Sequence, residues 1–329
     1  MRRIVGRLLA ALLIFVAWAA PLAARPLVFP APDRELMVPV AGGKIYVRIN
    51  GDIHSGRPPV IFVHGGPGGT HRPFLDALAL ADQRAVILYD QLDSGRSDHP
   101  GIAANWTVGR FVGELESIRA ALGIDRWYVD GASWGGTIAL EYAARRPAAL
   151  AGVVLASPLV STRSWIADAN ALRATLPLHT QRTISRCETR KRPAKATCDS
   201  ATAAFNAAFG RREPVIPPAF KGPQNPADRG NNETLYNRMW GSSEYVSTGT
   251  LKSYDGEPLL ARLDGRHTLF MVGQYDEARP VTAIRFARRV KDAELAVIPG
   301  AGHSTLFDRP DETLAVLRAW FNRQDQSAR

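Results

Sequence analysis

The segment at residues 131–135, Gly-Ala-Ser-Trp-Gly, constrains the fold of this chain more than any other stretch. It follows a short apolar run at 127–129 and opens a helix-like run at 137–146. A Gly-x-Ser-x-Gly sequence between a strand and a helix is typical of a nucleophile elbow, a sharp turn that exposes a serine hydroxyl. Small residues flank such a serine because a Cβ there would collide with the neighbouring strand or helix. The pattern is short enough to occur by chance, so the sequence around it has to decide.

Strand-like and helix-like segments alternate on both sides of this turn. A hairpin pattern at 35–49 is followed by short apolar runs, at 59–63, 85–89, 127–130 and 152–156. Helical patterns lie between these runs, at 73–82, 108–122 and 137–146. Alternation of this kind predicts an α/β fold with a mostly parallel sheet flanked by helices.

The alternation stops after Ser157. From 158 to 250 the chain is rich in Arg, Ala and Pro and has no strand pattern, which predicts a helical cap inserted over the sheet. Strand and helix patterns then return, at 267–272, 282–290, 294–298 and 311–321. We therefore expect a core formed by residues 26–157 and 251–329, interrupted by a cap at 158–250.

Residues 1–25 have the pattern of an export signal peptide. Three arginines precede an apolar run at 8–18, and small residues follow it. The apolar run is short for a membrane span. The small residues do not form a clean cleavage site, so an uncleaved anchor stays an alternative. We expect an exported protein, periplasmic or secreted, that contacts a membrane only if this segment is retained.

The two cysteines, Cys187 and Cys198, agree with export. In an oxidising compartment they would close a small loop by a disulfide, and the alternative is two free thiols. No histidine or third cysteine lies near them at metal-ligand spacing, so no metal site is expected. Part of the net charge of +10 clusters at 182–195. Because no aromatic residues are interleaved with that cluster, nucleic acid is not an expected partner.

A serine hydroxyl needs a base and an acid before it can act as a nucleophile. Of the seven histidines, only His303 follows the last predicted strand, in a glycine-rich loop. Asp276 comes just after the strand that ends at Val272, with Glu277 as the alternative acid. The order Ser133, Asp276, His303, each after a predicted strand, is that of the α/β-hydrolase fold.

An oxyanion hole needs two backbone N–H donors. We expect one from Trp134, directly after the nucleophile, and one from Gly66, in the loop His-Gly-Gly-Pro-Gly-Gly at 64–69. The loop lacks the residues of a phosphate-binding loop and the spacing of a dinucleotide fingerprint. No cofactor is therefore expected, and His64 and His71 are expected to hold the loop.

Several of these segments resemble the proline iminopeptidases, α/β-hydrolase aminopeptidases that release N-terminal residues, often proline. The matching segments are HGGPGG at 64–69, YDQLDSGRS at 89–97, GASWGG at 131–136, MWGSSEY at 239–245, GQYDE at 273–277 and GHS at 302–304. The resemblance implies a peptide or small amide substrate with a free N-terminus. It also implies a cap-side carboxylate that binds the α-ammonium, matched by Glu244 and, more loosely, by Glu213.

The chain departs from the family in two places. The family run Asp-Gln-Arg-Gly has Leu92 and Asp93 at its last two positions here, a change expected to alter the charge near the pocket rim. The cap is the least similar part, so the preferred N-terminal residue stays open, and the oligomeric state is not predicted. An esterase or lactonase on the same fold would use the same triad on an ester, without a carboxylate for an amine. A non-catalytic binding protein is the third alternative.

Overall fold

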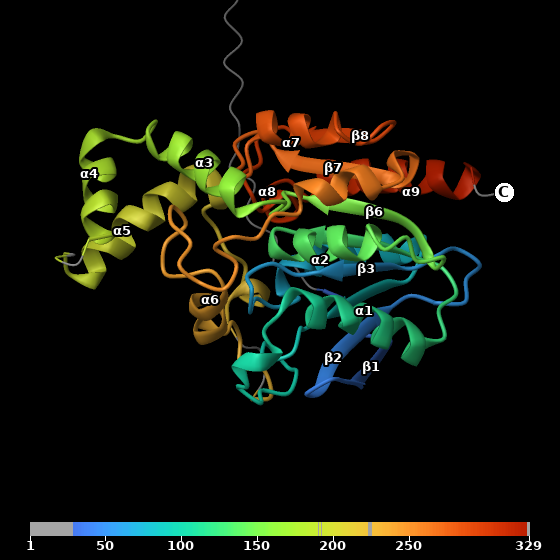
Figure 1. Ribbon diagram of the computed structural model, residues 1–329. Helices are drawn as coiled ribbons and strands as arrows, with labels where there is room; N and C mark the ends of the chain where they lie inside the picture. The colour runs from blue at the N-terminus through green and yellow to red at the C-terminus, as the bar shows by residue number, and fades with distance from the viewer. Residues whose placement is uncertain (1–28, 190, 192, 223–225, 328–329) are drawn as a thin grey trace, which may run out of the picture.

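A computed structural model describes residues 29–189, 191, 193–222 and 226–327. The predicted export signal at 1–25 lies outside the described residues. The centre of the molecule is an eight-stranded sheet in the order β1-β2-β4-β3-β5-β6-β7-β8 (Figure 1). The strands are β1 (Arg34–Val40), β2 (Gly43–Asn50), β3 (Val60–Val63), β4 (Val86–Tyr89), β5 (Trp127–Ala132), β6 (Leu150–Ala156), β7 (Thr268–Gly273) and β8 (Glu294–Ile298).

The sheet is parallel from β4 through β3 to β8, while β1 and β2 form an antiparallel hairpin at one edge. The predicted hairpin and the predicted mostly parallel sheet are both confirmed. The carboxyl ends of the parallel strands meet at one edge of the sheet, which is where this kind of sheet binds ligands.

Helices cover both faces of the sheet. The helices α1 (Val108–Leu122), α2 (Trp134–Ala143) and α7 (Pro280–Ala287) bury apolar side chains against one face. The 3₁₀ helix η1 (Arg72–Asp82) and the helices α8 (Thr305–Asp308) and α9 (Pro310–Ser327) do so against the other. Because side chains alternate along β5, Trp127 and Val129 enter the first layer, and Tyr128, Asp130 and Ala132 face the second.

The cap consists of helices and loops between β6 and β7. It contains α3 (Thr162–Arg173), α4 (Leu178–Cys187), α5 (Lys195–Phe205), the π-helical turn η3 (Asn206–Gly210), the 3₁₀ turn η4 (Pro218–Phe220) and α6 (Glu233–Met239). Figure 1 shows α4 and α5 projecting from the sheet as a pair. A disulfide joins Cys187 to Cys198 between them, and Ile184, Phe205 and Tyr245 form a small core of their own with neighbouring residues.

Three short 3₁₀ turns complete the described structure: η2 (Ala103–Asn105), η5 (Glu257–Arg262) and η6 (Gly265–His267). Among the helices that the structure describes, none has both the length and the apolarity needed to cross a bilayer.

Candidate active site

Ser133 lies on the turn between β5 and α2 with φ 59° and ψ −120°. A left-handed φ is strained for a residue with a side chain, and it persists only where the surrounding structure enforces it. Two glycines allow the turn to pack. A Cβ on Gly131 would lie 2.2 Å from the carbonyl oxygen of Gly135, and a Cβ on Gly135 would lie 2.0 Å from that of Val63. The elbow therefore presses directly on β3 and on the start of α2, and Ser133 is held at the carboxyl edge of the sheet.

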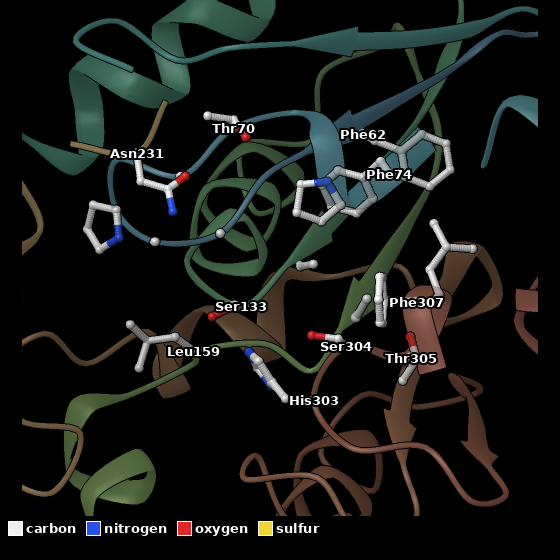
Figure 2. A pocket seen from close by; sticks show the side chains of 18 of the residues that line it. Phe62, Thr70, Phe74, Ser133, Leu159, Asn231, His303, Ser304, Thr305 and Phe307 are labelled. Atoms are coloured by element: carbon white, nitrogen blue, oxygen red, sulfur yellow. The ribbon is translucent and has the colours of Figure 1, made fainter. Parts of the chain in front are cut away.

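His303 and Asp276 meet at this edge from two other loops. The Nδ1 atom of His303 lies 2.8 Å from Oδ1 of Asp276. In Figure 2 a ring nitrogen of His303 points toward Ser133. If Nδ1 carries the proton toward Asp276, Nε2 is left as an acceptor for the serine proton. The structure thus brings together the three residues that the sequence nominates as nucleophile, acid and base.

The Asp276 carboxylate is buried and fully hydrogen-bonded. Besides His303, it accepts from the backbone N–H groups of Gly273 at 3.1 Å and Ala278 at 2.8 Å, and from the hydroxyl of Ser157. These donors fix the carboxylate, and the carboxylate fixes the imidazole. Asp276, and not the alternative Glu277, has the geometry of the orienting acid.

Three carboxylates surround the imidazole of His303. Burial alone would lower the pKa of His303, but Asp276, Glu277 and Glu244 together outweigh burial and raise this pKa to about 9. Burial also raises the pKa of Glu277, with Glu244 and Asp276 adding to that rise and His303 opposing it. A cation placed among these groups would therefore favour the ionised form of the carboxyls and be stabilised by them.

The glycine-rich loop at 64–69 lies against the nucleophile. A Cβ on Gly65 would lie 3.1 Å from the Cβ of Ser133, so a side chain at this position would crowd the serine. The N–H groups of Gly66 and Trp134 donate no hydrogen bond to any residue in the described part of the chain. Two free N–H groups, from this loop and from the residue after the nucleophile, are what an oxyanion hole requires.

His64 locks this loop to the elbow. Its Nδ1 lies 2.9 Å from the carbonyl oxygen of Gly65, and its Nε2 accepts the N–H of Gln91 at 2.9 Å. The Gln91 side chain in turn accepts the indole N–H of Trp134 at 2.9 Å. Burial lowers the pKa of His64 to about 4, so the ring is neutral and acts as a structural connector. His71 holds the adjoining segment through the 2.8 Å contact of its Nδ1 with Asp90.

Leu92 and Asp93 do not lie at the pocket rim, so the expected change of charge there is wrong. Both are fully buried. Leu92 belongs to the apolar core, and the Asp93 carboxylate accepts the N–H of Gly101 and the indole N–H of Trp106, each at 2.7 Å. Asp93 has φ 68°, the left-handed conformation that explains why a glycine serves at this position elsewhere.

A cavity of about 440 Å³ opens above Ser133 and reaches the cap. This volume suits a small ligand. Its cap side is formed by Trp165, Tyr236, Trp240 and Glu244, and Glu277 and His303 complete it. The Trp165 indole packs edge-on against His303, with the ring centroids 5.3 Å apart. Among the described residues that line the cavity, four are acidic and none is Lys or Arg.

The structure separates the two glutamates proposed for amine binding. Glu244 lines the cavity and accepts a short hydrogen bond from the Tyr236 hydroxyl. Glu213 is not a lining residue, and its carboxylate accepts the N–H of Val215 at 3.2 Å. Glu277 lies in the cavity instead, and its Oε2 atom is buried with no hydrogen-bond partner in the described structure. The sequence signal for Glu277 was its place next to Asp276, which suggested only an alternative acid.

The cap also supports the loop that bears the base. The N–H of His303 donates to the carbonyl oxygen of Phe209 at 2.8 Å, and that of Ser304 donates to Gly210 at 2.9 Å. Both acceptors lie in the π-helical turn η3. The position of the imidazole therefore depends on the cap as well as on the sheet.

Nothing in the described part of the chain assembles a metal site, since no three His, Cys, Asp or Glu side chains converge as ligands there.

Comparison with known proteins agrees with this geometry. The alpha/beta hydrolase fold family matches residues 58–310. A proline iminopeptidase of Heyndrickxia coagulans is 34% identical over 288 residues, which cover 88% of this chain and 98% of the relative. The crystal structure of a Mycobacterium smegmatis proline iminopeptidase superposes with a TM-score of 0.81 at 32% identity, covering 90% of this chain and all of the other. The crystal structure of VinJ gives a TM-score of 0.82 at 31% identity, covering 89% and 100% of the two chains.

Proposed function

This chain belongs to the proline iminopeptidase family within the α/β-hydrolase fold, and on that basis we propose that it is a serine aminopeptidase. The proposed substrates are short peptides or aminoacyl amides with a free N-terminus, and proline is one candidate for the released residue. Two relatives that are 34% and 33% identical to this chain are named proline iminopeptidases.

The observation that carries the proposal is the pair of carboxylates beside the base. Glu244 and Glu277 line the same cavity as Ser133 and His303, and the lining residues in the described structure include no Lys or Arg to balance them. The unpartnered Oε2 of Glu277 needs a donor. A substrate α-ammonium has three N–H donors and a positive charge, so it would satisfy both glutamates by charge-assisted hydrogen bonds.

The proposed reaction follows from these positions. Because Glu244, Glu277 and Ser133 line one cavity, we place the ammonium on the two glutamates and the first carbonyl carbon over Ser133. The Ser133 oxygen attacks that carbon while Nε2 of His303 takes its proton, and Asp276 stabilises the imidazolium. The N–H groups of Gly66 and Trp134 stabilise the oxyanion. His303 then protonates the leaving amine, and water hydrolyses the acyl-enzyme with His303 again as the base.

The ammonium also lowers the barrier to the first step. The negative field of the neighbouring carboxylates raises the pKa of His303 and favours the protonated imidazole in the empty site, a form that cannot act as a base. A bound cation neutralises part of that field and lowers the pKa of His303 toward neutrality. A substrate without a free amine lacks this effect, which favours removal of terminal residues over cleavage within a chain.

A matched set of glutamate variants tests the proposal. Wild type should hydrolyse aminoacyl arylamides, proline arylamide included, and should not hydrolyse their N-acetylated forms. Glu277→Gln and Glu244→Gln should each reduce kcat/KM by about 10- to 160-fold, because a charged hydrogen bond contributes roughly 1.5–3 kcal/mol. Glu213→Gln is the control, since that side chain lies outside the cavity.

The alternative activities give different results in the same assay. Hydrolysis of short acyl esters without any arylamide turnover would establish an esterase and refute the aminopeptidase proposal. Hydrolysis of free and N-blocked arylamides at equal rates would refute the role of the two glutamates. Absence of all turnover would favour a binding protein.

We propose further that residues 1–25 direct export. The disulfide between Cys187 and Cys198 supports this proposal, because disulfides persist mainly in oxidising compartments. Expression of the full chain with fractionation of periplasm and medium, followed by intact-mass measurement, tests both export and cleavage. Retention in the cytoplasm at full mass would refute it.

A further inference from the structure

The cavity continues behind Ser133 into the apolar layer between the sheet, η1 and the helices α8 and α9. This inner pocket is lined by Phe62, Phe74, Asp130, Met271, Leu306 and Leu317. In the view of Figure 2, Phe62 and Phe74 lie on one side of Ser133, and Leu159 and Asn231 lie on the other. The inner pocket therefore belongs to the same cavity as Ser133 and lies on the side of the nucleophile away from Leu159 and Asn231.

Among the six residues just named, Asp130 is the only one with an ionisable side chain. The alternation of β5 directs it into the same layer as Tyr128 and Ala132, and its partners in register are Phe62 and Val154. Asp130 is 1% exposed, and neither carboxyl oxygen has a hydrogen-bond partner in the described structure. A buried carboxyl with both oxygens unsatisfied costs several kcal/mol, so its presence needs a reason.

We propose that the inner pocket binds a basic side chain of the substrate, a lysine- or arginine-like group, with Asp130 as its counter-ion. The inference rests on the proposed aminopeptidase function only in taking the ligand to be part of a peptide or aminoacyl amide. The basic residue is either the one released or the one that follows it.

The walls and the charge both fit such a group. The methylene stem of a basic side chain packs well along apolar surface while its charged end finds a polar partner. The described lining of the cavity has no Lys or Arg that could pair with Asp130. A ligand cation is then the missing partner for both free oxygens, and a guanidinium or ammonium supplies several N–H donors at once.

The state of the empty pocket agrees with this assignment. Burial alone raises the pKa of Asp130 to about 8, and no charged neighbour contributes to that shift. The carboxyl is therefore largely neutral at pH 7 without ligand, and an arriving cation stabilises the ionised form. A neutral substrate group hydrogen-bonded to the protonated carboxyl is the competing arrangement, and the experiment below separates the two.

Four ligands test the proposal, in two pairs: lysinamide and norleucinamide, and the amides of Ala-Lys and Ala-norleucine. Within each pair the α-ammonium is the same, and only the side-chain ammonium differs. Binding is measured by calorimetry with the Ser133→Ala protein, and kcat/KM is measured with the active enzyme. We expect the lysine member of one pair to be favoured at least tenfold in both measurements, and that pair identifies the position of the basic residue.

Variants connect this preference to Asp130. Asp130→Asn keeps the shape without the charge, and Asp130→Ala removes the group without a clash. In both, the Lys-to-norleucine ratio should fall to about 1. Asp76→Asn is the matched control. Asp76 is a partly buried carboxyl on η1 whose pKa is raised to about 6 by burial, and it lies outside the cavity lining. That variant should keep the ratio of the wild type.

The outcomes distinguish this inference from the proposed function. If lysine ligands bind the Ser133→Ala protein in preference to norleucine ligands but no substrate is hydrolysed, the inner pocket stands and the aminopeptidase proposal fails. If the amides are hydrolysed but neither pair shows a lysine preference, the basic-group assignment is overturned. A preference for norleucine would show that Asp130 serves neutral groups. Should both Asp130 variants fail to fold, the ratios of the Asp130-containing proteins still decide.

Discussion

The Oε1 atom of Glu277 lies 3.7 Å from Nε2 of His303, the ring nitrogen that has to accept the proton of Ser133. A carboxylate at this place competes with the nucleophile for the imidazole in the empty site. When a substrate ammonium binds Glu277, this carboxylate pairs with the ammonium and competes less for the imidazole. The pair therefore links amine recognition to the protonation state of the base.

Removing the Glu277 carboxylate should shift the pH dependence of the reactivity of Ser133. The base works only when His303 is neutral, and its raised pKa of about 9 delays that state to alkaline pH. Glu277→Gln removes one of the groups that raise this pKa, so the acid limb of the rate should move to lower pH. The rate of labelling of Ser133 by an uncharged fluorophosphonate measures the shift without any amine in the ligand. An unchanged limb in Glu277→Gln would contradict the proposed coupling.

Replacing the nucleophile should abolish turnover without unfolding the protein. Ser133→Ala keeps a Cβ at φ 59°, so the strain of the elbow is unchanged and the stability should stay close to that of wild type. Turnover of the best arylamide should fall by roughly 10⁴-fold or more, as for other serine triads. Circular dichroism and chemical unfolding provide the control. Residual activity within 10²-fold of wild type would assign the nucleophile to another residue.

A methyl group at Gly135 should be far more damaging than one elsewhere in a helix. The new Cβ would lie 2.0 Å from the carbonyl oxygen of Val63, a backbone atom of β3 that cannot move alone. We expect Gly135→Ala to lose activity and several kcal/mol of unfolding free energy. Gly113→Ala in α1 is the control, because a Cβ there has no neighbour within 4 Å. That change should stabilise the protein by about 0.5–1 kcal/mol. Equal effects of the two changes, measured by urea unfolding, would contradict this packing.

The triad and the sheet could be predicted because each depends on a local pattern. Ser133, Asp276 and His303 follow predicted strands in a fixed order, and the parallel sheet brings the carboxyl ends of those strands together. The residues that recognise ligands are harder to predict from the sequence. The role of Glu277 depends on the direction of its side chain into a cavity that only the cap completes. Glu213 matches the family's cap carboxylate only loosely in sequence, and it lies outside that cavity.

The surroundings of Asp93 and Asp130 could not be predicted from the sequence. Asp93 replaces a glycine of the family pattern, and the sequence alone suggested a change of charge near the pocket rim. The structure buries Asp93 because its carboxylate satisfies two N–H donors that the loop presents inward. The sequence does contain one indication for Asp130, because it is an acidic residue within a predicted buried strand. Its lack of a partner could be seen only after the neighbouring helices had been placed.

Breaking the disulfide should weaken the cap first. In a chain-entropy estimate, a link across 11 residues stabilises the folded state by about 3 kcal/mol. The double variant Cys187→Ser, Cys198→Ser should therefore unfold at lower denaturant. Activity should fall with stability under mild denaturation, because η3, which follows α5 directly, accepts the N–H of His303. Reductant should reproduce the effect in wild type and leave the double variant unaffected. Equal stability of the oxidised and reduced wild type would show that the disulfide does not stabilise the cap.

The buried carboxyl of Asp130 should make wild type less stable as the pH rises. Its folded pKa of about 8 lies above the value of about 4 in an unfolded chain, so the folded state holds the proton more tightly. The resulting stabilisation is complete below pH 4 and is lost as the pH rises through 8, at up to about 1.4 kcal/mol per pH unit. Asp130→Asn cannot titrate and should lack this slope. Urea unfolding of both proteins at pH 5, 6, 7 and 8 measures the difference, and parallel curves would show that Asp130 is ionised and paired in the folded state.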